Sequence, residues 1–117
     1  MTINYTQARE NMVEQQVRPW DVLDARVLET LATLPREAFV AAELKPLAYI
    51  DEDLLICPAS GNNPARYVME PSPLAKLIQL AEIAGSDVVL EVGCGTGYAS
   101  AILSLLGSSV VALESDS

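Results

Sequence analysis

The chain has 117 residues, a length typical of a single domain, and half of it is hydrophobic, which is enough for a buried core. It carries 16 acidic and 7 basic residues, so the net charge is −9. This balance argues against a nucleic-acid or anionic-membrane partner, because phosphates attract Lys and Arg.

The N-terminal section, residues 1–70, is predicted to form short helices and loops. Thr6 is an N-cap candidate for a helix over roughly 7–18. Asp24 is an N-cap candidate for a second helix, which ends before Pro35. The beginning of the chain lacks the basic and apolar segments of a secretory signal.

A loop-rich stretch follows, in which Pro58, Gly61 and Pro64 interrupt regular structure. Short strands are expected on either side of these residues, at 53–57 and 65–69. Cys57 and Cys94 show no metal or redox spacing, so we expect two reduced thiols, no metal site and a cytoplasmic protein.

From residue 71 to 117 the pattern becomes regular. Ser72 is the N-cap candidate and Pro73 the first residue of a helix that Gly85 would close. The apolar run 87–92 resembles a strand buried on both faces. A helix closed by Gly107 and a second apolar strand over 109–113 complete a βαβ unit with two parallel strands.

The turn after the first of these strands carries glycine at every second position, at Gly93, Gly95 and Gly97. Such a turn lets the backbone approach a ligand closely and starts the helix near the sheet. Glu114 ends the neighbouring strand, where a carboxylate can accept hydrogen bonds from both hydroxyls of a ribose. The unit therefore predicts an adenosine-type cofactor, although a turn that only joins strand to helix is the simpler alternative.

Two phosphate-binding patterns fail here. The dinucleotide pattern G-x-G-x-x-G needs glycine where Tyr98 stands, and the P-loop needs a lysine that this stretch lacks. What is present is an acid at Glu91, an apolar residue, and then G-x-G-x-G.

This pattern resembles the class I S-adenosylmethionine-dependent methyltransferases. The resemblance implies that Glu91 lies near the methionine amino group of S-adenosylmethionine and that Glu114 binds its ribose. It also implies a cofactor-facing loop, formed by Gly93, Cys94, Gly95 and Gly97. The scarcity of basic residues agrees with this, since the cofactor carries no phosphate. No residue is a convincing catalytic acid or base.

The upstream sequence is similar to the protein-L-isoaspartate O-methyltransferase family. Three segments carry the resemblance, "MVEQQ" at 12–16, "DARVL" at 24–28 and "PREAFV" at 35–40. It implies an α/β fold, namely the start of a doubly wound Rossmann-like methyltransferase sheet preceded by a helical section. It also implies methyl transfer to a carboxylate on a protein or small-molecule substrate.

The segment 66–71 departs from the family, which has a Ser where Met69 stands. A thioether is a poor hydrogen-bond partner, and Glu70 would repel a carboxylate. A relative that binds the cofactor but lacks isoaspartate repair is therefore one alternative, and a nicotinamide-binding half-domain is another. Arg66 is interpreted as a solvated surface residue rather than a partner of the substrate carboxylate.

The family's sheet has further strands, so we interpret the chain as the N-terminal part of a longer enzyme, truncated after the second strand. Its two parallel strands are nearly purely apolar and carry no Lys or Pro to protect an edge. We therefore expect residues 1–117 alone to self-associate and to be inactive.

Overall fold

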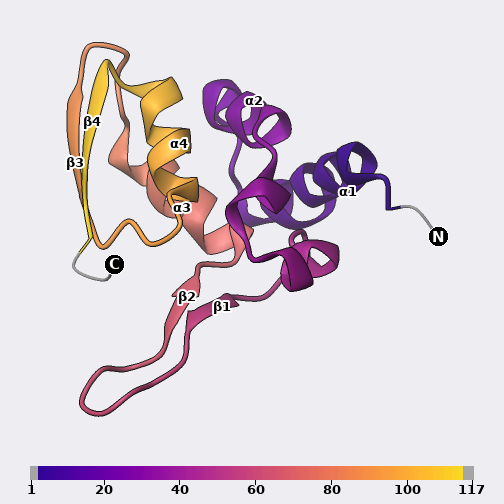
Figure 1. The fold of residues 1–117 in the computed structure, drawn as a ribbon. Coiled ribbons are helices and arrows are strands. Elements are labelled where there is room, and N and C mark those ends of the chain that lie inside the picture. Colours follow the sequence, from indigo (N-terminus) through magenta and orange to yellow (C-terminus); the bar gives the residue numbers. More distant parts are fainter. Residues whose placement is uncertain (1–2, 115–117) are drawn as a thin grey trace.

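The structure is a computed structural model that describes residues 3–114 of the chain (Figure 1). Helical segments fill the first part, a small antiparallel hairpin follows, and a parallel β-α-β unit ends the described chain. The main elements are α1 (Tyr5–Met12), α2 (Ala25–Thr33), β1 (Leu54–Cys57), β2 (Arg66–Val68), α3 (Pro71–Ala81), β3 (Val88–Val92), α4 (Tyr98–Leu106) and β4 (Ser109–Leu113). Shorter helical segments are a π-helix over Val13–Val17 and 3-10 turns over Arg18–Trp20, Arg36–Phe39 and Ala42–Leu47.

The N-terminal caps of the first two helices match the prediction at α2 but not at α1. Asp24 caps α2 as predicted, and its carboxylate accepts hydrogen bonds from the backbone N–H groups of Arg26 and Val27. Thr6 does not cap α1, because Asn4 lies two residues earlier and accepts from the N–H of Gln7. Asn and Thr are both good N-caps, so the preference alone could not separate them.

Helix α3 begins and ends earlier than predicted. Pro71 is its first residue and Ser72 lies inside the first turn, where its hydroxyl donates to the backbone oxygen of Gln16 at 2.9 Å. Ser72 is therefore used to join α3 to the N-terminal helices rather than to cap its own helix. The C-cap is Glu82, in the left-handed conformation at φ 51°, and not Gly85.

Strands β3 and β4 pair in parallel, with Glu91 opposite Ala112, and α4 connects them. The predicted strand–helix–strand unit is thus confirmed, and Gly107 closes α4 as expected. Both α3 and α4 lie on the same side of this sheet (Figure 1).

The prediction that residues 87–92 are buried on both faces is wrong for the described structure. Val89 and Val110 point inward and pack against the core. The alternate residues Val88 and Val92 are 73% and 76% exposed. Within residues 3–114, the helices cover one face of the β3–β4 sheet, and the apolar side chains of the other face have no cover.

One hydrophobic cluster joins the N-terminal helices to the β-α-β unit. Its members come from α1, the π-helix, α2, α3 and α4, and they include Met12, Val17, Leu31, Ala75 and Ile102, all fully buried. The helices of the first section therefore hold α3 and α4, and with them the glycine turn, in place. No helix among the described residues is both long and apolar enough to cross a membrane.

Candidate functional site

The glycine turn lies between β3 and α4 and takes the conformation that its glycines allow. Gly93, Gly95 and Gly97 all have positive φ values, of 75°, 58° and 92°. The backbone N–H groups of Gly93 and Cys94 donate to the carbonyl oxygen of Leu113 at 2.7 and 3.2 Å. The loop is therefore tied to the last residue of β4, so that the ends of both strands meet at one edge of the sheet.

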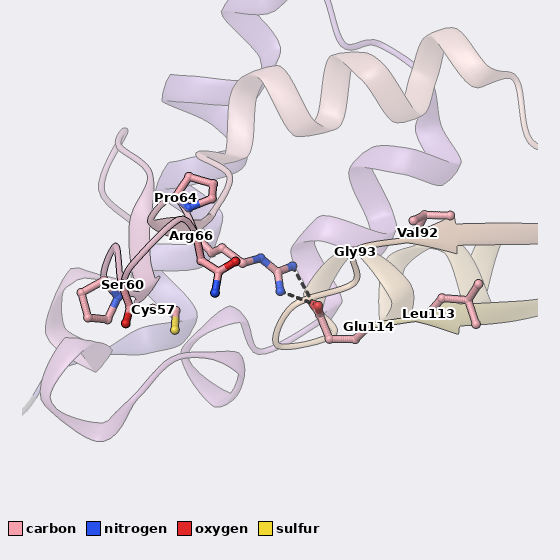
Figure 2. Close-up of a pocket in the computed structure, with 10 residues that line it drawn as sticks. Cys57, Ser60, Pro64, Arg66, Val92, Gly93, Leu113 and Glu114 are labelled. Atoms are coloured by element: carbon pink, nitrogen blue, oxygen red, sulfur yellow. Dashed lines mark hydrogen bonds and ion pairs between the residues drawn. The ribbon is translucent and has the colours of Figure 1, made fainter. Parts of the chain in front are cut away.

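A cavity of about 570 Å³ opens at this edge (Figure 2). The carboxyl ends of β3 and β4 form one wall, and the loop between β1 and β2 forms the other. Its lining includes Cys57, Ser60, Asn63, Arg66, Gly93 and Glu114. The volume lies in the range of small-molecule sites, and ligands of open parallel sheets bind outside the carboxyl ends of the strands.

Glu114 is the acidic residue of this cavity, and two parts of the chain converge on it. Its Oε1 accepts from the backbone N–H of Gly95 at 2.6 Å. Arg66, on β2, donates to Oε1 from Nη2 at 2.6 Å and to Oε2 from Nη1 (Figure 2). The side chains of Arg66 and Glu114 are 27% and 17% exposed, so Arg66 is not the solvated surface residue that the sequence suggested.

Glu91 borders a second cavity, of about 260 Å³, which shares Val92 and Gly93 with the first. Its carboxylate accepts a hydrogen bond from the hydroxyl of Ser100 in α4. Cys94, Gly95 and Met69 also line this cavity, and Gly93 lines both cavities. The structure thus brings five of the six predicted site residues to two adjoining cavities, while Gly97 lines neither.

Arg36 is a residue whose position could not be predicted from the sequence. It is fully buried, with its guanidinium 4.8 Å from the centre of the Tyr98 ring. Its Nε donates to the carbonyl of Ala48 at 2.6 Å and its Nη2 to the carbonyl of Met69 at 3.1 Å. Burial lowers the pKa of Arg36, and it raises the pKa of Tyr98 to about 12. Arg36 therefore joins the segment before α3 to the first residue of α4, directly after the glycine turn.

Comparison with known proteins identifies the family. The family model for protein-L-isoaspartate(D-aspartate) O-methyltransferase matches residues 7–115. The chain belongs to this family. A protein-L-isoaspartate O-methyltransferase of Koribacter versatilis is 41% identical over 106 residues, and one of Protochlamydia amoebophila is 41% identical over 103 residues. These alignments cover 91% and 88% of this chain but 45% and 46% of the relatives, so the chain spans about half their length.

Solved structures agree with this assignment to the methyltransferase family. A protein-L-isoaspartate O-methyltransferase superposes with a TM-score of 0.74 at 25% identity, over 92% of this chain and 34% of that chain. A putative member from Plasmodium falciparum, solved in complex with S-adenosyl-L-homocysteine, superposes with a TM-score of 0.66 at 20% identity. It matches 97% of this chain over half its own length, and at that identity it supports the fold. The expected start of a methyltransferase α/β fold, with a helical section before it, is confirmed.

Proposed function

We propose that the full-length protein is an S-adenosylmethionine-dependent O-methyltransferase that transfers a methyl group to a carboxylate. The observation that carries this proposal is the convergence of Glu114 and the glycine turn on one cavity at the carboxyl ends of β3 and β4. Membership of the family supports it.

The residues of the site suit this cofactor. Glu114 would bind the ribose, and Glu91, at the second cavity, would bind the methionine amino group. Gly93, Cys94, Gly95 and Gly97 would form the loop beneath the cofactor. The two cavities share Gly93, so an elongated ligand could extend from one to the other. Among residues 3–114, Arg66 is the only basic residue that lines either cavity, which fits a cofactor without phosphate.

The reaction would depend on positioning. When bound, S-adenosylmethionine supplies a methyl group already activated by its sulfonium sulfur. The chain's task is to orient that group in line with the acceptor oxygen and to exclude water. A carboxylate acceptor is ionised near neutral pH, so no residue has to act as a general base.

A second candidate function, supported by the surroundings of Met69, is that of a cofactor-binding relative without isoaspartate repair. Met69 lines the second cavity beside Glu91, and its thioether offers no hydrogen-bond donor. Glu70 follows in a cluster of acids, where a hydrogen bond with Asp51 and the charges of Asp51 and Asp53 raise its pKa. An incoming carboxylate would meet negative charge at this point.

Two measurements on the full-length protein test these proposals. Calorimetric titration should show binding of S-adenosylhomocysteine and none of NAD; the reverse result would overturn the cofactor assignment. A methyl-transfer assay with an isoaspartyl peptide then separates the two candidate functions. We expect little turnover because of Met69 and Glu70, so robust turnover would favour repair activity.

We further propose a cytoplasmic location, which agrees with the free thiols of Cys57 and Cys94.

A further inference from the structure

Arg66 is hydrogen-bonded to the Glu114 carboxylate, which the proposed function assigns to the cofactor ribose. Arg66 reaches Glu114 from the hairpin across the cavity, and both ends of its guanidinium are used (Figure 2). The Gly95 N–H donates to the same carboxylate from the glycine turn. Glu114 thus accepts hydrogen bonds from both the hairpin and the glycine turn.

The acceptor capacity of Glu114 is nearly used up by these bonds. An ionised carboxylate offers about four lone-pair positions. Arg66 fills two of them and Gly95 a third, so at most one remains. A ribose that donates from both of its hydroxyls needs two positions. The ribose therefore cannot bind Glu114 in full while the Arg66 pair is intact.

Between Arg66 and the Gly95 N–H, Arg66 is the donor that can leave. The Gly95 N–H belongs to a loop whose backbone is tied to Leu113, so its position is fixed by the sheet. The Arg66 guanidinium stands at the end of a flexible side chain that is 27% exposed. Its rotation needs no backbone movement.

We propose that the cofactor ribose displaces Arg66 from Glu114, and that the released guanidinium then binds the carboxylate of the methyl acceptor. This inference rests on the proposed function. Arg66 already holds a carboxylate with its two-pronged donor group, the geometry that Arg offers to carboxylates in general. No other basic residue of the described part of the chain lines the two cavities. Cofactor binding would therefore precede acceptor binding, and Arg66 would select acceptors with a carboxylate.

Chemical modification of Arg66 tests its release directly. The full-length protein is treated with phenylglyoxal, which reacts with accessible guanidinium groups, and modification of each Arg is followed by mass spectrometry. S-adenosylhomocysteine should accelerate modification of Arg66, whereas an analogue without the ribose hydroxyls should not. Arg18 is the internal control, because it pairs with Glu14 on the surface at 2.9 Å and should react equally in every sample. Protection or an unchanged rate at Arg66 in the S-adenosylhomocysteine complex would overturn the proposal.

Addition of succinate tests the acceptor step. In the S-adenosylhomocysteine complex, this dicarboxylate probe should slow the modification of Arg66, while the neutral succinamide should not. Equal rates with both compounds would overturn the role of Arg66 in carboxylate recognition.

Affinity gives an independent measurement. Arg66→Met removes the competitor and should tighten S-adenosylhomocysteine binding by about fivefold, the upper value for a partly exposed ion pair. The control Arg18→Met should leave the affinity unchanged. Weaker or unchanged binding by Arg66→Met would contradict the displacement. If the parent protein fails to bind S-adenosylhomocysteine at all, the proposed function itself is wrong; binding without a change at Arg66 rejects this inference alone.

Discussion

Replacement of the buried Arg36 by Met should destabilise the protein by about 3 kcal/mol. Arg36 donates two charged hydrogen bonds to backbone carbonyls, each contributing about 1.5–3 kcal/mol. The contact with the Tyr98 ring adds about 2 kcal/mol in a dry setting. The cost of burying the charge offsets several kcal/mol of this stabilisation, because Arg36 is fully buried and its Nη1 has no hydrogen-bond partner among the described residues.

Urea unfolding of the full-length protein measures this change. A loss of about 3 kcal/mol corresponds to a fall in the midpoint of about 1–3 M at ordinary m-values. Arg18→Met is the matched control, because the Arg18–Glu14 pair is a surface pair at helical spacing and should contribute at most about 0.5 kcal/mol. An Arg36→Met variant as stable as this control would refute the reasoning that Arg36 fastens the segment before α3 to α4.

Three further predictions concern the loop, the pH dependence and the exposed sheet. Gly95→Ala should weaken S-adenosylhomocysteine binding, because the φ of Gly95 is 58° and the new Cβ would lie 3.0 Å from Ile56 Cδ1. The control is Gly61→Ala, which has the same φ but open space around it and should keep full affinity in the same titration. Burial alone would raise the pKa of Glu37, but hydrogen bonds from Tyr49, its own backbone and Arg9 lower the pKa below 4.5 overall. The stability that Glu37 contributes is therefore present above pH 4.5 and lost as the pH falls through the lowered pKa. The midpoint of urea unfolding should consequently fall less steeply at acidic pH in Glu37→Gln than in the parent protein. Residues 1–117 by themselves should self-associate through the exposed apolar face of β3 and β4, which sedimentation over a dilution series would detect; a monomer at all concentrations would contradict this.

The β-α-β unit was predictable because its signals are local. Two apolar runs, a glycine turn and Gly107 specify strand, turn, helix and strand within a short stretch. Asp24 was predictable for the same reason, since an N-cap bonds to the next residues in the chain. The start of α3 was not, because Ser72 satisfies its hydroxyl on Gln16, 56 positions away in sequence.

The contacts within the candidate site depend on such long-range pairs. The sequence indicated Glu114 and the glycines, but not that Arg66 reaches Glu114 across 48 positions or that Arg36 stacks on Tyr98. Both arginines look like ordinary surface residues in a linear sequence. The apolar run 87–92 indicated a strand, yet the sequence could not show which of its faces the described helices cover.

Most of the proposed function depends on one contact, in which Glu114 holds the ribose of S-adenosylmethionine at the carboxyl ends of β3 and β4. The most direct test is calorimetric titration of the full-length protein and of Glu114→Gln with S-adenosylhomocysteine and with an analogue lacking both ribose hydroxyls. We expect the substitution to weaken binding of S-adenosylhomocysteine much more than binding of the analogue, since a carboxylate accepts stronger hydrogen bonds than an amide. Equal losses for both ligands, or no loss for either, would contradict it.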